Sequence, residues 1–171
     1  TGTYVFMATA NGTVKKTPLV QFSKPRSSGL IALRLEEGDT LIAAAVTDGA
    51  REVMMFSDGG KVIRFKESKV RTMGRTARGV RGMRLPEGQR IISMLIPEAG
   101  AQILSASARG YGKRTPLADY PRRGRGGQGV IAMVINERNG KLVGAVQVLD
   151  GEEIMLISDQ GTLVRTRVSE V

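Results

Sequence analysis

The 171-residue sequence contains no cysteine and no histidine. This absence excludes disulfides, thiol nucleophiles, zinc sites built from cysteine and histidine, and imidazole acid–base chemistry. A chain without cysteine suits a reducing compartment, and no signal peptide opens it, so we expect a cytoplasmic protein. The first residue is threonine where a complete chain would begin with methionine, which favours a piece of a longer polypeptide.

Aromatic residues and long apolar runs are also scarce. Aromatics make up 4% of the chain and tryptophan is absent, which argues against a platform that stacks single-stranded bases. No apolar run approaches the ~20 residues of a membrane helix, so we expect no membrane partner. Apolar residues nevertheless reach 41%. A chain of this length can bury roughly 70% of its unfolded surface, so a folded domain is predicted.

Basic residues exceed acidic ones by 26 to 16, which gives a net charge of +10 and a pI near 10.5. An excess of this size indicates a polyanionic partner, although solubility explains a few charges. The distribution of the charges along the chain has to separate the two explanations.

The sequence repeats about every 50 residues. The segments VFMATANGTVKKT, VMMFSDGGKVIRF, ILSASARGYGKRT and IMLISDQGTLVRT align on the anchor glycines Gly12, Gly60, Gly110 and Gly161. A second glycine precedes an apolar run in the first three units, at Gly29, Gly79 and Gly129. We therefore predict a single domain over 1–171 with repeats at approximately 1–50, 51–100, 101–151 and 152–171, the last one incomplete.

Each repeat holds about four short runs rich in valine, isoleucine, leucine and methionine, separated by glycine-containing turns. Such runs are too short for helices and are typical of hairpin strands. A period of this length predicts an all-β, propeller-like fold of four-stranded antiparallel blades, about three and a half of which are present. Methionines 54, 55, 94 and 155 fall in strand runs, and we expect them in the core.

Basic residues recur at fixed places in the repeat. Four residues after each anchor glycine stand Lys16, Arg64, Arg114 and Arg165, with Lys15, Lys61, Lys66, Lys113 and Arg167 close by. The loops before the second glycines carry Lys24 and Arg26, then Lys69, Arg71, Arg75 and Arg78, then Arg122, Arg123 and Arg125. Equivalent positions of a repeat fall at equivalent places, so we predict a positive outer belt that binds the phosphates of double-stranded DNA without reading its sequence.

The alternative is that these side chains pair with acidic residues of the next blade. Exposed pairs of that kind contribute little, typically under ~1 kcal/mol each. The basic edge outnumbers the acids near it, which favours the belt.

The stretch DYPRRGRGGQGV, residues 119–130, could be a disordered arginine–glycine tail, a phosphate-binding glycine loop or an ordered loop. It aligns with the two earlier basic loops, which favours the ordered loop. Gly124, Gly126 and Gly129 spell G-x-G-x-x-G, but that motif needs a strand before it and a helix after it. A tyrosine–proline pair precedes it here and a β-type run follows it. Dinucleotide binding is therefore disfavoured.

No group of residues indicates catalysis or metal binding. The three tyrosines, Tyr4, Tyr111 and Tyr120, are expected to be packing or rim residues, although a tyrosyl nucleophile acting on DNA is conceivable. Acidic residues at 36, 37, 39, 152 and 153 sit at hairpin tips without metal-ligand spacing. We expect no catalytic residue and no metal ligand in this chain.

Five long strings are distinctive: FMATANGTVKKT (6–17), VMMFSDGGKVIRFKESKVR (53–71), GYGKRT (110–115), ERNGKLVGAVQV (137–148) and GTLVRTRVSE (161–170). They resemble the family of C-terminal domains from the A subunit of bacterial DNA gyrase. The resemblance implies a β-pinwheel, in which neighbouring blades exchange strands, and a DNA-wrapping role in an ATP-dependent type IIA topoisomerase that introduces negative supercoils. It also implies a bacterial cytoplasmic holoenzyme of two A and two B subunits, with ATP, magnesium and the active-site tyrosine held elsewhere.

The signature box of that family, Q-R-R-G-G-K-G, has no copy here. The loop Arg122, Arg123, Gly124, Arg125, Gly126, Gly127, Gln128 and Gly129 resembles it loosely in a later blade. The first blades are therefore expected upstream of the first residue, with the last blade cut at Val171. The missing box leaves open the equivalent domain from the A subunit of topoisomerase IV. A module that binds acidic proteins or RNA is the alternative from a different class.

Overall fold

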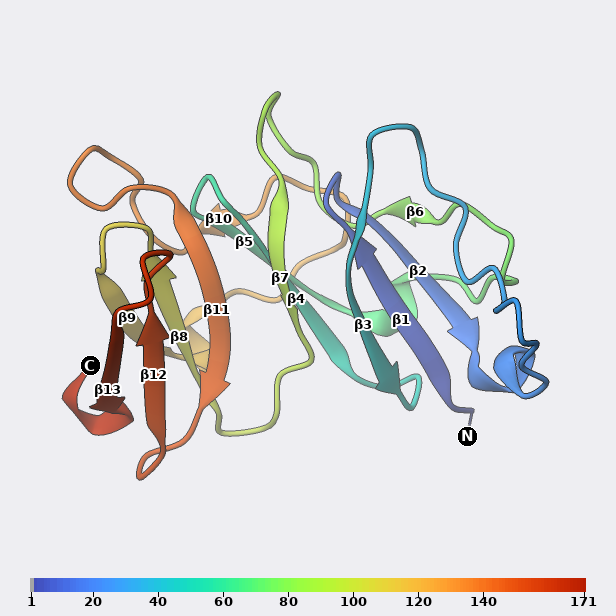
Figure 1. Cartoon of the computed structure of the whole chain (residues 1–171). Coiled ribbons are helices and arrows are strands. Elements are labelled where there is room, and N and C mark those ends of the chain that lie inside the picture. Colours follow the sequence, from blue (N-terminus) through green and yellow to red (C-terminus); the bar gives the residue numbers. More distant parts are fainter. Residues whose placement is uncertain (1) are drawn as a thin grey trace.

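The computed structural model describes residues 2–171 as an all-β chain, and those residues contain four short 3₁₀ helices and no α-helix. The strands form four antiparallel sheets that stand side by side in chain order (Figure 1). The prediction of an all-β fold with four-stranded antiparallel sheets is confirmed for the first two sheets.

The first sheet contains β1 (Tyr4–Thr9), β2 (Thr13–Pro18), β3 (Leu41–Thr47) and β6 (Val80–Arg81). The second contains β4 (Glu52–Ser57), β5 (Lys61–Lys66), β7 (Ile91–Leu95) and β10 (Val130–Ile131). The third contains β8 (Gln102–Ser107), β9 (Gly112–Pro116) and β11 (Leu142–Val148), and the fourth β12 (Glu153–Ile157) and β13 (Leu163–Arg167). A 3₁₀ helix follows the hairpin in each: η1 (Leu19–Phe22), η2 (Glu67–Lys69), η3 (Leu117–Asp119) and η4 (Val168–Glu170).

The first two sheets each take one strand from the following repeat. β6 pairs with β2 through Val80 opposite Val14, and β10 pairs with β5 through Val130 opposite Val62. The strand exchange that the family resemblance implied is therefore present at the first and second of the three boundaries. It joins successive sheets by backbone hydrogen bonds as well as by packing.

The anchor glycines make this exchange possible. Gly12 and Gly60 have φ angles of +92° and +81°, which side chains of L-residues rarely adopt. Their carbonyl oxygens accept hydrogen bonds from Gly82 N (2.8 Å) and Ala132 N (2.7 Å) of the incoming segments. A β-carbon at either glycine would collide with the carbonyl oxygen of Met83 or Met133. The repeated glycine thus leaves room for the donated strand.

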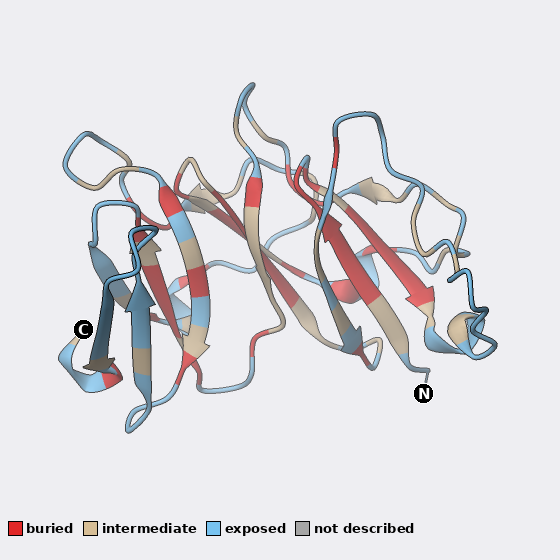
Figure 2. Cartoon of the chain, in the orientation of Figure 1, coloured by how far each residue is buried: buried red, intermediate tan, exposed pale blue. Residues whose placement is uncertain are grey.

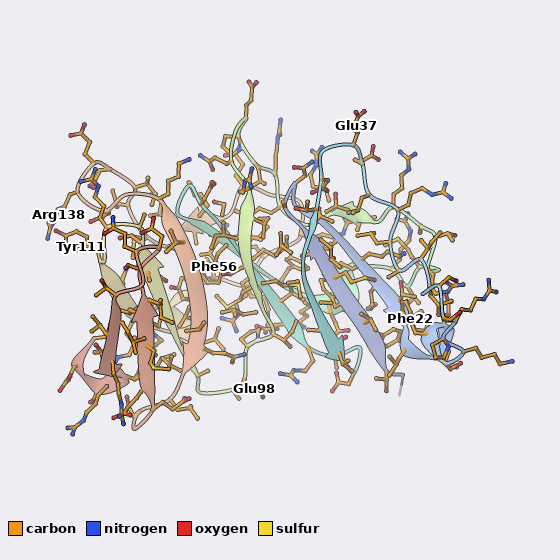
Figure 3. All side chains as sticks on the ribbon, in the orientation of Figure 1. Phe22, Glu37, Phe56, Glu98, Tyr111 and Arg138 are labelled. Atoms are coloured by element: carbon orange, nitrogen blue, oxygen red, sulfur yellow. The ribbon has the colours of Figure 1, made fainter. Side chains whose placement is uncertain are left out.

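The core lies between successive sheets, where the buried residues concentrate (Figure 2). Alternate residues of β4 point to opposite faces, so Val53 and Met55 pack toward the first sheet while Met54 and Phe56 pack toward the third. This is why the run is apolar throughout. Figure 3 shows Phe56 pointing into this interior.

The prediction that the methionines fill the core is confirmed for Met54 and Met55, and Met94 packs against the same core. It is wrong for Met155, whose exposed fraction is 63%. Met155 lies in β12, and no further sheet covers the β12–β13 hairpin in the described chain.

Candidate functional site

The repeated basic position after each anchor glycine is engaged with other protein groups. Arg64 donates from Nε to Glu52 Oε2 (2.6 Å) and from Nη1 to the carbonyl oxygens of Leu117 (3.0 Å) and Tyr120 (2.9 Å). Arg114 pairs with Asp150 at 2.7 Å, and Arg165 donates to Glu153 at 2.6 Å. The expectation that this position forms a row of unpaired outward cations is wrong. In each repeat the residue at this position has an acidic side chain or a backbone carbonyl as its partner.

Lys15 and Lys16 lie inside the molecule, so placing them on an outer belt was also wrong. The Nζ of Lys15 donates to the carbonyl oxygen of Ala32 at 2.8 Å and to that of Arg75, and the residue has an exposed fraction of 0%. Burial, followed by the nearby Arg75 charge, lowers the pKa of Lys15 to about 8. Lys16 donates to the carbonyl oxygen of Glu67 at 3.3 Å and lies 5.1 Å from the ring centre of Tyr4. Backbone carbonyls replace water for both amines.

Three arginines of the basic loops also bind protein groups. Arg75 donates to the carbonyl oxygen of Ile31 (3.0 Å), and Arg125 to those of Lys69 (2.9 Å) and Arg81 (3.0 Å). Arg78 pairs with Glu36 at 2.7 Å, with both side chains more than half exposed. The belt is therefore sparser than the basic residue count suggested.

A strongly basic cavity remains at the boundary between the second and third sheets. This basic inter-sheet pocket has a volume of about 440 Å³ and is lined by Lys66, Ser68, Lys69, Arg122, Arg123 and Gly124. None of the six is acidic. Within residues 2–171, the side chains of Lys66, Lys69 and Arg123 are exposed and make no hydrogen bond or ion pair to protein. Four cations of two successive repeats thus converge on one opening.

Glu52 organises one wall of this pocket. Its carboxylate accepts hydrogen bonds from Arg64 (2.6 Å) and from Arg122 (2.9 Å). Burial acts to raise the pKa of Glu52, but the hydrogen bonds and charges of the two arginines outweigh it and lower the pKa below its usual value. The charged carboxylate holds Arg122 at the pocket mouth.

The equivalent opening between the first and second sheets has different chemistry. It has a volume of about 740 Å³, and apolar residues dominate its lining, among them Tyr4, Pro18, Leu19, Val20 and Phe22. Phe22 stands at the N-terminal end of the molecule in Figure 3. The belt predicted from the repeat is therefore not uniform along the row of sheets.

The other predicted DNA-binding residues are dispersed. Exposed positions are held by Lys24 and Arg26 after η1, Arg71 after η2, Lys113 in β9 and Arg167 in β13, whereas Lys61 is half-buried at the start of β5. Ser68 was missed because a count of charges does not detect a hydroxyl. The exposed Arg34 and Arg84 were missed too, although both stand five residues after a second glycine.

The glycine-rich stretch 122–129 is an ordered loop attached to the scaffold. Gly126 N donates to Gly82 O at 2.7 Å, and Gly127 O accepts from Arg84 N at 2.8 Å. These bonds dock the loop on the preceding repeat. Its structure therefore differs from that of a free arginine–glycine tail.

Neither a metal centre nor a membrane helix was found in the described residues. No group of three or more acidic side chains in 2–171 could hold a metal ion. No helix within the same residues has the length and apolar character to cross a membrane.

Comparison with known sequences supplies the family. The model of the DNA gyrase C-terminal domain, beta-propeller, matches residues 3–48, 51–98, 101–148 and 152–171. The A subunit of DNA gyrase from Pseudomonas aeruginosa is 81% identical over 171 residues, which cover 100% of this chain and 18% of that protein. The corresponding gyrase protein of Escherichia coli is 55% identical over 170 residues, which cover 99% of this chain and 19% of that protein.

Two solved structures share the fold. A crystal structure of the C-terminal domain of DNA topoisomerase IV has a TM-score of 0.93 at 29% identity, covering 100% of this chain and 54% of that chain. A structure of the DNA gyrase A C-terminal domain has a TM-score of 0.88 at 27% identity. The match covers 99% of this chain and 57% of that chain. These two matches do not separate gyrase from topoisomerase IV, whereas the identity to the curated gyrase proteins favours gyrase.

The chain spans about a fifth of the length of the curated relatives it matches. The family model covers most of the chain, repeat by repeat, and the observed sheets have the strand exchange expected of such repeats. The chain therefore belongs to the DNA gyrase C-terminal domain family.

Proposed function

We propose that this chain binds the phosphate backbone of duplex DNA along one side of its row of sheets, and bends and wraps it. The basic inter-sheet pocket is the observation that carries the proposal. Lys66, Lys69 and Arg123 line this opening of about 440 Å³ and have no protein partner among the described residues, while Arg122 also lines it and pairs with Glu52. Unpaired cations around a non-acidic cavity favour a phosphate ligand.

The proposed contact surface consists of exposed cations without a protein partner in residues 2–171, together with Arg122, whose side chain is half exposed although it pairs with Glu52. It includes Lys24, Arg26, Lys66, Lys69, Arg71, Lys113, Arg122, Arg123 and Arg167. Contacts of this kind release counterions and carry little sequence information, so binding weakens steeply with salt. Bending 20–30 base pairs costs about 1–6 kcal/mol, which several such contacts offset.

Within a longer protein, this domain would present a bent DNA segment to a separate cleavage centre. We propose that this longer protein is the A subunit of a bacterial gyrase and that it acts together with B subunits in an A₂B₂ assembly in the cytoplasm. ATP, magnesium and the catalytic tyrosine would be held outside this chain, which itself would not be catalytic. The domain's part is to set the path of the DNA.

A charge-removal variant tests the DNA proposal. Lys66→Gln, Lys69→Gln and Arg123→Gln combined should lower duplex affinity and reduce the salt slope of binding by up to about 3. The matched control removes three exposed cations near the hairpin tips at the other end of the strands: Arg90→Gln, Arg109→Gln and Lys141→Gln. Equal losses in the two variants would indicate nonspecific attraction and contradict the proposed site.

Two further measurements address the alternatives. Competition between duplex DNA and single-stranded RNA should favour the duplex, because a surface that bends DNA recognises its regular backbone. A holoenzyme containing this domain should introduce negative supercoils into relaxed circular DNA. Decatenation without supercoiling would assign the domain to topoisomerase IV.

A further inference from the structure

Cationic side chains cross the first two boundaries between repeats in the same way. Lys16 Nζ donates to the carbonyl oxygen of Glu67 at 3.3 Å, and Arg64 Nη1 donates to that of Leu117 at 3.0 Å. Glu67 and Leu117 are the first residues of η2 and η3, so the two bonds are equivalent. Each runs from one repeat to the next.

A second contact runs in the opposite direction. Arg75 Nη1 donates to Ile31 O and Arg125 Nη1 to Arg81 O, both at 3.0 Å. The two arginines stand four residues before Gly79 and Gly129, and their acceptors stand two residues after Gly29 and Gly79. The geometry therefore repeats with the period of the chain.

We infer that Lys16, Arg64, Arg75 and Arg125 are positioning residues that set the rotation between successive sheets. For DNA they would act through the curvature of the row of sheets rather than by touching phosphate. That consequence rests on the proposed function. The effect on sheet orientation does not.

Besides the short strand pairs, backbone hydrogen bonds from Met73 N to Lys16 O and from Arg123 N to Arg64 O, both 2.8 Å, connect successive repeats, and the side-chain bonds of Lys16 and Arg64 reinforce these points. β6 meets β2 over two residue pairs, and β10 meets β5 over two. These pairs lie at the starts of β2 and β5, whereas Lys16 and Arg64 lie toward the other ends of the same strands. The apolar core between the sheets is non-directional. Directed hydrogen bonds at a second point along the strand restrict rotation about the first.

Arg125 has the widest reach of the four. It stands on the connection from η3 to β10, which joins the third sheet to the second. Its guanidinium holds Lys69 O at the end of η2 and Arg81 O in β6, a strand of the first sheet. One side chain thus ties all three sheets together.

At the first boundary a side-chain hydrogen bond stands where the second boundary has a backbone hydrogen bond. At the second boundary Gly126 N donates to Gly82 O at 2.7 Å. The equivalent acceptor at the first boundary, Ala32 O, binds Lys15 Nζ at 2.8 Å, and the same amine donates across the boundary to Arg75 O. A buried lysine therefore replaces a backbone hydrogen bond at this position.

The inference is tested with Arg125→Met, which keeps the aliphatic stem and removes the donors. Spin labels attached to Ala44→Cys in β3 and Ala108→Cys after β8 report the distance between the first and third sheets, and the parent chain has no cysteine to interfere. We expect the distance distribution to shift or broaden beyond that of the parent. End-labelled duplex DNA should show an altered bend while the salt slope of binding stays within about 0.3 of the parent value.

The matched control is Arg123→Met, two residues away, whose side chain has no protein partner among the described residues. It should leave the label distance unchanged and reduce the salt slope by about 1. If circular dichroism shows that Arg125→Met does not fold, Arg125→Lys is measured in its place. Lysine keeps the charge but cannot span both carbonyls with a planar fork, so the same distance change is expected.

An unchanged label distance in the folded Arg125 variant would overturn the inference. So would a loss of salt slope in that variant equal to that of Arg123→Met. If the label distance changes but neither variant affects duplex binding, sheet positioning stands and the proposed DNA function fails.

Discussion

The Nζ of Lys15 lies 2.8 Å from the carbonyl oxygen of Ala32 in its own repeat, and because it also donates to the carbonyl oxygen of Arg75, it joins two repeats inside the protein. A lysine that sequence alone places with the DNA-binding cations thus has a structural position. The neighbouring Lys16 behaves in the same way toward Glu67 O. The positive charge of these two lysines therefore did not show whether they bind DNA or stabilise the fold.

Lys15 should give stability a specific pH dependence. Burial lowers its pKa from 10.5 to about 8, so between these values the unfolded chain binds more protons than the folded chain. The free energy of unfolding should accordingly rise with pH in this window, by no more than about 1.4 kcal/mol per pH unit. Urea denaturation of the parent and Lys15→Met across the window measures the effect. A parent-minus-variant difference that stays flat with pH would contradict the assignment.

Glu52 should contribute stability above the pKa of an unfolded glutamate. Its lowered pKa means that this contribution is lost as the pH falls through the folded value. At neutral pH Glu52→Gln should reduce the free energy of unfolding by roughly 1–3 kcal/mol, because it leaves Arg64 and Arg122 without their shared acceptor. The control Glu98→Gln breaks an exposed pair with Arg51 and should lose under ~1 kcal/mol. Equal losses would show that the Glu52 network is unimportant.

Gly60→Ala should be more destabilising than Gly88→Ala, although the two glycines have φ angles of +81° and +80°. Both variants incur the backbone strain of a left-handed residue, roughly 1–2 kcal/mol. Only at Gly60 does the new β-carbon meet Met133 O and Ile135, whereas nothing lies within 4 Å at Gly88. The clash should add roughly 1–3 kcal/mol. Thermal unfolding that ranks the two variants equally would refute the role of Gly60 in admitting β10.

The apolar opening at the first boundary predicts a gain of function. Val20 and Thr72 correspond to Ser68 and Arg122 of the basic inter-sheet pocket. Combined Val20→Lys and Thr72→Arg should tighten duplex binding and steepen its salt dependence by about 1 per added phosphate contact. Two lysines placed instead at Ala108 and Ala99 control for net charge. If both variants show the same increase, the bound DNA does not pass over the first boundary.

Much of the fold follows from local sequence. Short apolar runs between glycine turns predict strands because the turn geometry is encoded within a few residues. Gly12 and Gly60 recur because the same donated strand approaches each of them closely. The all-β architecture and the family were accordingly available from the chain itself. More of the fold than of the candidate site could therefore be predicted from the sequence.

The site depended on contacts between residues far apart in the chain. Arg64 meets Glu52 within its own hairpin but also Leu117 O and Tyr120 O of the next repeat, and Arg125 meets Lys69 O and Arg81 O. No period in the sequence reveals whether a carbonyl oxygen or water faces a given guanidinium. Among the predicted contacts that line the basic inter-sheet pocket, Lys66, Lys69 and Arg123 have no side-chain partner in the described chain, so a ligand can pair with their charges.

The sequence by itself determined the repeat, the strands, the anchor glycines and the excess of positive charge, because each depends on residue type and short-range spacing. Only the tertiary structure decided which cations are neutralised and which face solvent. That outcome is set by desolvation and by acceptors brought close from other repeats, and both arise only when the sheets pack together.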